Sequence, residues 1–330
     1  MIRVALLDDY QRVGLKLAPW RELAGQAEVQ AFHDNVQDAA ALAKRLGPFE
    51  VAMALRERAP FSRELLERLP NLRLIASAGM RNAAIDLDAA TELGILVCGS
   101  AGSLRPTTEL TWGLIFAVTR GIPHEREKLR RGIWQDEFLG WGLDSKTLGL
   151  VGLGNIGAQM VPIAKAFGVN VIAWSENLKP ERAAELGVKA VSKEELFRAA
   201  DIVSIHLKLS ARSTGIIGAR ELGWMKRGAY LVNTSRGPIV DERALIEALR
   251  RGRIAGAGLD VFDQEPLPEK HPLLGLDHVV ALPHLGYVTE QVLTIFYRET
   301  LDNVWGYLSG DYKRVLNPEV QSRLRPRPSA

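Results

Sequence analysis

Three short segments of the sequence carry side chains that suit proton transfer on an organic acid. Arg236 lies in Asn-Thr-Ser-Arg-Gly, Glu265 precedes Pro-Leu, and His284 lies in Pro-His-Leu-Gly. An arginine fork can grip a carboxylate through two hydrogen bonds. A histidine can give or take one proton near neutral pH, and a carboxylate on its other ring nitrogen fixes the tautomer and favours the charged form. Arg236, Glu265 and His284 are therefore the catalytic candidates.

Each of these segments follows a predicted strand. The strands are Ala229–Asn233, Ala255–Val261 and Val279–Ala281. Because the carboxyl ends of parallel strands share one edge of a sheet, where ligands bind, we expect the three side chains to meet there. Taken singly, an arginine after a strand, a glutamate before a proline and a histidine on a loop all have ordinary structural explanations. The three side chains would form a catalytic site only if the fold brings them together.

A glycine-rich turn predicts that a nucleotide binds at the same edge. The apolar run Leu148–Leu153 predicts a buried strand, and the glycines after it have the G-x-G-x-x-G spacing at the start of a helix. Such glycines permit a tight turn, a close approach of the backbone to a pyrophosphate, and close packing of helix on strand. The alternative is a turn that serves packing alone. The predicted cofactor residues of this turn are Gly152, Gly154, Asn155, Ile156 and Gly157.

The composition is that of a globular protein with two cores. The chain has 330 residues, of which 47% are hydrophobic and 25% are charged. The chain has 42 basic and 39 acidic residues, and the basic ones form no long block, which argues against nucleic acid as a partner. Cys98 is the only cysteine, so we expect no intrachain disulfide, no metal and a reducing, cytoplasmic location. No signal peptide or membrane partner is expected either, because the chain opens on a strand pattern and lacks a long apolar run.

Strands and helices alternate on both sides of the glycine turn, which predicts an α/β protein with parallel sheets and right-handed crossovers. In the first hundred residues the predicted strands are Ile2–Leu7, Val29–Phe32, Val51–Leu55, Leu72–Ser77 and Ile95–Cys98. The predicted helices there are Gly14–Leu23, Val36–Leu46, Ser62–Leu69 and Leu87–Leu93. Ser62 and Asp86 are predicted helix N-caps. Thr107–Arg120 is an amphipathic segment that we interpret as a helix leading into the glycine-rich domain.

The chain resembles the D-isomer-specific 2-hydroxyacid dehydrogenases from Ile2 to about Glu319. The matching motifs, in order and spacing, are Gly152-Leu-Gly-Asn-Ile-Gly157, Asn233-Thr-Ser-Arg-Gly-Pro-Ile-Val-Asp241, Leu259-Asp-Val-Phe-Asp-Gln-Glu-Pro-Leu267 and Pro283-His-Leu-Gly286. The resemblance implies two domains. A Rossmann-like NAD(P)-binding domain (101–286) would be inserted into a flavodoxin-like parallel-sheet substrate domain (1–100 with 287–330). It also implies a homodimer, with the long helix after Thr107 as its arm.

The resemblance also assigns roles. It implies hydride transfer between a nicotinamide cofactor and a 2-hydroxy or 2-oxo acid, with His284 as the acid/base, Glu265 as its partner and Arg236 on the substrate carboxylate. Thr234, Ser235 and Asp260 would line the nicotinamide half. Three further positions are expected beside the cofactor, namely Ser175, His206 and Lys208, the last standing where the family commonly has proline.

The substrate loop departs from the family pattern. This chain has Met80-Arg-Asn-Ala-Ala84 where the family usually shows glycine and then Asp-Asn or Asp-His. That loop reaches the substrate in the family, so Met80, Arg81 and the nearby Arg56 are the substrate candidates together with Arg236. A second cation beside Arg236 would favour substrates that carry a second acidic or strongly polar group over pyruvate.

The ribose-binding acid of the family is also missing. Ser175 stands at its position and Glu176 follows. A 2′-phosphate requires a cation and is repelled by an acid, so we expect NAD(H) to be favoured over NADP(H). Lys179 is the one cation close in sequence that would reverse this preference.

Two other functions use the same fold. A dinucleotide-sensing corepressor, as in the C-terminal binding proteins, would be a binding module with residual turnover. A hydrolase similar to adenosylhomocysteine hydrolase is the other alternative, against which the set of Arg236, Glu265 and His284 argues. Turnover measurements distinguish both alternatives from a dehydrogenase.

Overall fold

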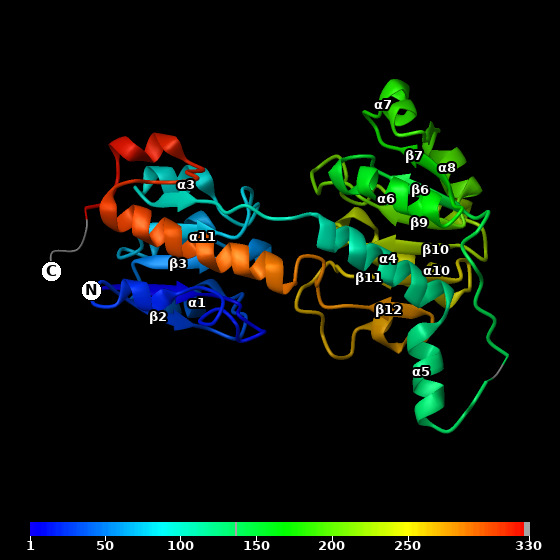
Figure 1. Cartoon of the computed structure of the whole chain (residues 1–330), viewed down its shortest axis with the longest axis horizontal. Helices are drawn as coiled ribbons and strands as arrows, with labels where there is room; N and C mark the ends of the chain where they lie inside the picture. The colour runs from blue at the N-terminus through cyan, green and yellow to red at the C-terminus, as the bar shows by residue number, and fades with distance from the viewer. Residues whose placement is uncertain (136, 327–330) are drawn as a thin grey trace. The chain divides into compact units, whose positions relative to one another are not determined.

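Two parallel sheets organise the chain. The computed structural model describes residues 1–135 and 137–326, and it divides into two compact units (Figure 1). Unit 1 comprises Met1–Ser103 and Thr289–Ala330, and unit 2 comprises Leu104–Val288. Within the described residues, no helix combines the length and the apolarity needed to cross a membrane.

Unit 1 contains a five-stranded parallel sheet in the order β2-β1-β3-β4-β5. This is the flavodoxin-like order that the resemblance implies. Both central strands β3 and β4 are wholly buried, as expected for a parallel sheet covered on two faces. The strands are β1 (Ile2–Leu6), β2 (Ala27–Ala31), β3 (Val51–Ala54), β4 (Leu74–Ser77) and β5 (Leu96–Cys98).

The helices of unit 1 begin where their capping residues predict. Ser62 Oγ accepts the N–H of Leu65 at 3.4 Å, and Asp86 Oδ1 accepts the N–H of Ala89 at 2.8 Å, so both predicted N-caps are confirmed. The α-helices are α1 (Ala39–Leu46), α2 (Arg63–Glu67), α3 (Leu87–Glu92) and α11 (Glu290–Ser309). Short 3₁₀ helices cover Trp20–Leu23, Arg56–Arg58 and Pro318–Ser322.

The predicted helix over Gly14–Leu23 is wrong. This segment forms turns and then the 3₁₀ helix Trp20–Leu23. The buried carboxylate of Asp9 accepts the N–H groups of Val13 at 3.0 Å and Gly14 at 3.1 Å, which offers the backbone an alternative to a helix. Asp9 also accepts the hydroxyl of Tyr297 from α11 at 3.2 Å. A contact with a distant segment therefore overrides the local pattern.

Unit 2 contains a seven-stranded parallel sheet in the order β12-β11-β10-β9-β6-β7-β8. Read from β8, this is the doubly wound Rossmann order with one further strand, and the order reverses between β6 and β9. The strands are β6 (Thr147–Val151), β7 (Asn170–Trp174), β8 (Lys189–Ala190), β9 (Ile202–Ile205), β10 (Tyr230–Asn233), β11 (Gly256–Leu259) and β12 (Val279–Ala281).

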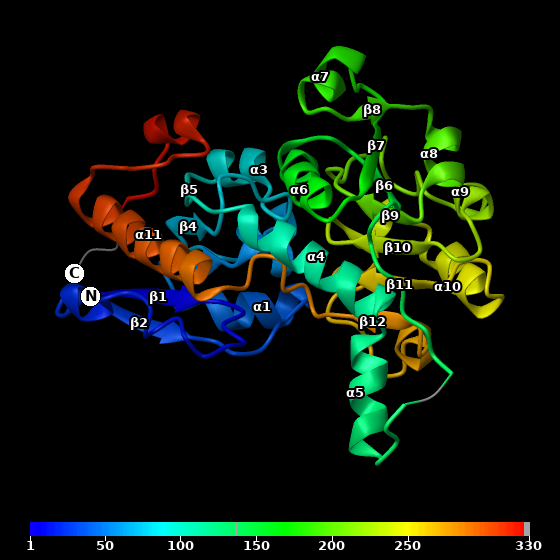
Figure 2. The ribbon, with the colours of Figure 1, turned by 45° about the vertical axis from the view of Figure 1, so that its right-hand side comes forward.

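Helices cover both faces of this sheet. Leu114 and Ile115 of α4 and Met160 of α6 belong to one buried core cluster, while Phe197 of α8 and Leu249 of α10 belong to another. Figures 1 and 2 show α4 lying across β10 and β11, whereas α5 points away from the sheet. The helices are α4 (Arg105–Thr119), α5 (Ile122–Arg130), α6 (Asn155–Ala166), α7 (Pro180–Glu185), α8 (Lys193–Ala199), α9 (Ala219–Trp224) and α10 (Glu242–Arg250), with 3₁₀ helices at Gly237–Ile239 and Pro272–Gly275.

Candidate active site

A histidine and a glutamate form a close pair at the carboxyl edge of the unit 2 sheet. His284 lies on the loop after β12, and Glu265 lies on the loop after β11. Nδ1 of His284 is 2.6 Å from Oε2 of Glu265, while Oε1 of Glu265 accepts the backbone N–H of Phe262 at 3.0 Å. Because Nδ1 faces the glutamate, Nε2 is the ring atom left to exchange a proton with a substrate.

The surroundings of Glu265 favour its ionised form. Burial raises the pKa of this carboxyl, but the hydrogen bond and charge of His284, the N–H of Phe262 and the charge of Arg236 outweigh burial, so the pKa is lowered. The carboxylate is therefore charged near neutral pH and stabilises a protonated His284. Arg236, Glu265 and His284 thus interact at one edge of one sheet, although no two of them are close in the sequence.

A buried aspartate anchors the loop that carries His284. Asp260 follows β11 and is fully buried; it accepts the N–H of Leu285 at 2.7 Å and of Gly286 at 2.8 Å. Burial raises the pKa of Asp260 to about 6, although the two N–H groups and the charge of His284 act against this. The hydroxyl of Thr107 donates to the Gly286 carbonyl at 3.0 Å. The family resemblance implied a cofactor contact for Asp260, and the sequence did not reveal this anchoring role.

The arginine segment is held by its own neighbours. Asn233 donates from Nδ2 to the Arg236 carbonyl at 2.9 Å, and its Oδ1 accepts the N–H of Ser235 at 3.0 Å. Arg236 itself donates to the Ser235 carbonyl at 2.7 Å. A Cβ atom on Gly237 would lie 2.0 Å from the carbonyl carbon of Phe262, so only glycine lets the Arg236 segment pack on the segment that leads to Glu265.

The glycine-rich turn has the shape of a phosphate cradle. Gly152 has a φ of +105°, and a Cβ atom there would lie 2.6 Å from the His206 carbonyl oxygen; one on Gly157 would lie 2.2 Å from the Gly152 carbonyl oxygen. Position 154 is different, since a Cβ atom on Gly154 would meet nothing within 4 Å. Helix α6 begins at Asn155 without a side-chain cap. Its first N–H groups, including that of Ile156, are therefore suited to an anion.

His206 adds an unsatisfied polar atom beside this turn. Its Nε2 lies 2.9 Å from the hydroxyl of Ser204, while its buried Nδ1 has no hydrogen-bond partner among the residues that the structure describes. Burial of the ring lowers the pKa of His206 to about 4, so the imidazole is neutral at pH 7. An orphaned nitrogen and an open glycine position both fit a bound dinucleotide.

Two predicted nicotinamide contacts have partners inside unit 2. The hydroxyl of Ser235 donates to the Ile205 carbonyl at 2.7 Å. The Thr234 hydroxyl lies 2.8 Å from that of Thr111 on α4. These two hydrogen bonds fix the end of β10, so both hydroxyls have a structural role in addition to the predicted one.

The end of β7 holds an ion pair that the sequence did not reveal. Ser175 directly follows β7, and the carboxylate of Glu176 lies 3.8 Å from the guanidinium of Arg212. Both side chains of the pair are exposed. Arg212 comes from the loop after β9, on which Lys208 is also exposed. Sequence distance concealed Arg212, because only the fold brings this loop to the end of β7.

The substrate candidates of unit 1 divide into two kinds. Arg56 donates to the Ala78 carbonyl at 3.2 Å, and its carbonyl accepts Nδ2 of Asn82 at 2.7 Å, so this residue supports the loop after β4. Arg81 on the same loop is exposed and makes no hydrogen bond or ion pair with the described residues, and Met80 is half exposed. Arg81 is thus the cation of this loop that is available to a ligand. No cluster suited to a metal ion occurs within residues 1–135 and 137–326.

Comparison with known proteins shows that the chain is similar to one family. Residues 112–286 match the model described as D-isomer specific 2-hydroxyacid dehydrogenase, NAD binding domain. The chain is 42% identical to a glyoxylate reductase of Thermococcus litoralis over 80% of its own length and 82% of the relative's. It is 37% identical to a D-3-phosphoglycerate dehydrogenase of Methanocaldococcus jannaschii over 88% of its own length, but spans only 54% of that protein. The crystal structure of a phosphoglycerate oxidoreductase from Vibrio cholerae O395 superposes with a TM-score of 0.89 at 36% identity, covering 94% of this chain and 100% of that one.

Proposed function

The chain belongs to the D-isomer-specific 2-hydroxyacid dehydrogenase family, and we propose that it interconverts a 2-hydroxy acid and the corresponding 2-oxo acid. The observation that carries this proposal is the interaction of Arg236, Glu265 and His284 at one edge of the sheet that also bears the glycine cradle. The cradle, helix α6 and the buried nitrogen of His206 would hold a nicotinamide dinucleotide.

The chain's own residues divide the work. A bound nicotinamide cofactor supplies or accepts the hydride at C2 of the substrate. In the direction of reduction, Nε2 of protonated His284 donates a proton to the substrate oxygen, and Glu265 stabilises the imidazolium through Nδ1. Arg236 binds the substrate carboxylate and stabilises the negative charge that develops on the oxygen. Oxidation uses the same groups in reverse.

NAD(H) is the favoured cofactor under this proposal. Two features would permit NADP(H). Ser175 stands where the family has the acid that binds a ribose hydroxyl, and Arg212 is a cation of the kind that a 2′-phosphate requires. However, the carboxylate of Glu176 pairs with Arg212 at 3.8 Å and repels a phosphate from the same place. The carboxylate of Glu176 therefore favours NAD(H) over NADP(H). The cation on which this preference depends is Arg212, not Lys179.

The proposed substrate carries a second acidic or strongly polar group. The support is Arg81, an exposed guanidinium on the loop after β4 that no described residue neutralises. A charged hydrogen bond contributes about 1.5 to 3 kcal/mol, which corresponds to roughly ten- to a hundredfold in kcat/KM. Such substrates should therefore be reduced more efficiently than pyruvate.

A homodimer is proposed as the working form. Helix α5 points away from its own sheet (Figure 2), and it and the segment after it expose large apolar side chains. An apolar surface of this kind is typical of an interaction site, and a second copy of the chain is the partner that the family resemblance implies. The resemblance puts the arm of the dimer at the long helix after Thr107, which is α4, whereas the surface proposed here is that of α5 and the segment after it. The exposed residues are Ile122, Leu129, Ile133, Trp134, Phe138 and Leu139. Sedimentation should give the mass of a dimer, and a monomer at micromolar concentration would contradict the proposal.

The test of the function is a spectrophotometric panel. The purified chain is assayed with NADH and with NADPH against glyoxylate, pyruvate, hydroxypyruvate, 2-oxoglutarate and 3-phosphohydroxypyruvate. We expect oxidation of the reduced cofactor with at least one 2-oxo acid, and higher kcat/KM for those with a second polar group. Arg81→Ala should lower kcat/KM for that group of substrates alone, whereas Arg68→Ala, an exposed control on the same unit, should change none. Absence of turnover with every acid would contradict the proposal.

A further inference from the structure

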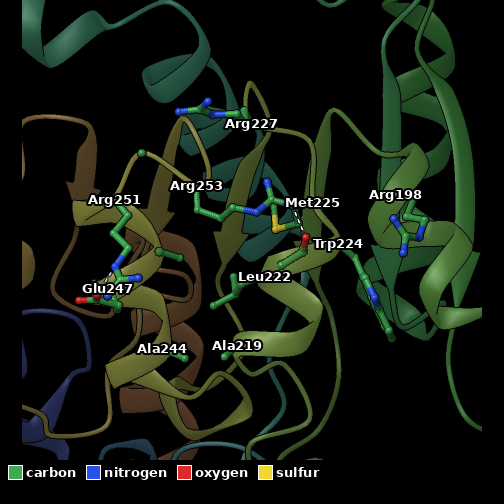
Figure 3. Close-up of a pocket in the computed structure, with 13 residues that line it drawn as sticks. Arg198, Ala219, Leu222, Trp224, Met225, Arg227, Ala244, Glu247, Arg251 and Arg253 are labelled. Carbon is green, nitrogen blue, oxygen red and sulfur yellow. Dashed lines mark hydrogen bonds and ion pairs between the residues drawn. The ribbon is translucent and has the colours of Figure 1, made fainter.

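A concave surface lies on unit 2, away from the candidate active site (Figure 3). The pocket has a volume of about 820 Å³. It is formed by α9, one face of α10, Arg198 of α8 and the turns that lead into β10 and β11. The two turns precede the first residues of β10 and β11, so the pocket lies at the amino edge of the sheet. The catalytic candidates follow the opposite, carboxyl ends of the strands.

Arginines dominate the charge of this pocket. Four guanidinium groups line it, on Arg198, Arg227, Arg251 and Arg253, against the single carboxylate of Glu247. Figure 3 shows Arg253 reaching across the pocket toward Met225, with Arg251 on one side and Arg198 on the other. We call this feature the arginine pocket.

Ion pairs inside unit 2 account for only part of this charge. Arg251 pairs with Glu247 one helical turn away, and Arg198 donates to Glu194 at 2.8 Å. Arg253 donates to a neutral acceptor, the Gly223 carbonyl. Arg227 is exposed and has no hydrogen bond or ion pair with the described residues. The arginine pocket therefore keeps uncompensated positive charge.

The floor of the arginine pocket is apolar. Leu222 and Met225 form it with small side chains, and both are almost fully buried. Trp224 stands at its side, with the guanidinium of Arg220 stacked 4.8 Å from the centre of its ring. The small side chains are Ala219, Ala244 and Ala248. A flat hydrocarbon or aromatic group can rest on such a floor while its charged group meets the arginines at the rim.

We propose that the arginine pocket is a second ligand site, for a small anion that joins an aromatic ring to a phosphate or similar acidic group. Charge complementarity selects the anion, because guanidinium forks match the oxygens of phosphate and carboxylate groups. The apolar floor selects the ring. A volume of about 820 Å³ suits one molecule of this kind. The site is separate from the reaction proposed above, and its occupancy does not depend on turnover.

The test uses the fluorescent aromatic anion 8-anilinonaphthalene-1-sulfonate on the full chain. The matched variants are Arg227→Glu, which reverses the unpartnered charge, and Arg250→Glu, which reverses an exposed charge two positions from Gly252 but outside the pocket. We expect Arg227→Glu to weaken binding at least tenfold and Arg250→Glu to leave it within twofold. Equal binding by all three proteins, or equal weakening in both variants, would overturn the proposal, since the first excludes the pocket and the second indicates general surface charge.

Competition tests the two halves of the ligand. Phenyl phosphate should displace the probe from the wild-type chain at a concentration at least tenfold below that needed for phenol or for inorganic phosphate alone. Displacement by inorganic phosphate at the same concentration as phenyl phosphate would overturn the aromatic part of the proposal. Turnover of the best 2-oxo acid serves as the folding control, because Arg227 has no place in the catalytic machinery and Arg227→Glu should retain the wild-type rate.

Discussion

At the scale of single residues, we propose that the pair of His284 and Glu265 carries out the acid/base chemistry. The 2.6 Å contact leaves one ring nitrogen for the substrate, and the lowered pKa of Glu265 keeps the carboxylate charged where the enzyme would work. This arrangement has a direct consequence for the pH profile.

Replacing Glu265 by glutamine should move the basic limb of the reduction profile to lower pH. The neutral amide cannot stabilise the imidazolium, so the protonated histidine that reduction requires is lost earlier as the pH rises. A charged hydrogen bond of about 1.5 to 3 kcal/mol predicts a displacement of about 1 to 2 pH units. The measurement is kcat/KM for reduction between pH 5 and 10. Glu269→Gln on the same loop is the control, and a basic limb that stays in place in Glu265→Gln would refute the pairing.

The pair of Glu176 and Arg212 should decide between the two cofactors. Glu176→Gln releases the guanidinium and removes the charge that repels a 2′-phosphate, so kcat/KM with NADPH should rise about tenfold relative to that with NADH. Adding Arg212→Ala should abolish this gain. Lys179→Ala is the matched control, because Lys179 is the cation nearest to Glu176 in the sequence. A gain that survives the loss of Arg212 would show that another group recognises the phosphate.

At the scale of elements, the loop that carries His284 depends on Asp260 at the end of β11. This carboxyl is fully buried, and its two oxygens accept the N–H groups of Leu285 and Gly286. Burial disfavours the ionised form of this carboxyl and raises the pKa of Asp260 to about 6 from an ordinary 3.8. The folded chain therefore binds this proton more tightly than the unfolded chain does.

This difference predicts a fall in stability as the pH rises from about 4 to 6. Because the folded-state pKa is the higher one, the stabilising contribution of protonated Asp260 is complete below pH 4 and is lost as the pH passes through 6. The loss amounts to about 3 kcal/mol. Asp260→Asn, which cannot ionise, should lack this component in urea unfolding measured from pH 4 to 7. A variant with the same pH slope as the wild-type chain would mean that Asp260 does not titrate in this range.

At the scale of the whole molecule, the sequence predicted the features that depend on local motifs better than the features that depend on distant contacts. The glycine turn, the strands around it and the caps at Ser62 and Asp86 depend on neighbours in sequence, and the structure places them as expected. The exception near Gly14 arises from Asp9 and a helix at the other end of the chain. The pair of Arg212 with Glu176 and the arginine pocket could not be predicted either, since each brings together segments that lie apart in the sequence.

The strand orders of both sheets followed from the resemblance alone. Alternating strands and helices predict parallel sheets, but periodicity does not state which strand lies beside which. The order β2-β1-β3-β4-β5 and the reversal between β6 and β9 therefore needed the family pattern. The catalytic set is different, because the residue types at three strand ends already predicted that Arg236, Glu265 and His284 would meet, and the sheet of unit 2 brings them together.

The central claim is that His284 is the acid/base of a nicotinamide-dependent reduction of a 2-oxo acid, and one pair of variants tests it most directly. NADH binding, followed by fluorescence, and kcat for the best 2-oxo acid are measured for His284→Ala and for His278→Ala, an exposed histidine just before β12. We expect His284→Ala to bind NADH within twofold of wild type while kcat falls by about 10² to 10⁴, and His278→Ala to change neither. A His284→Ala variant that keeps the wild-type kcat would show that His284 is not the acid/base.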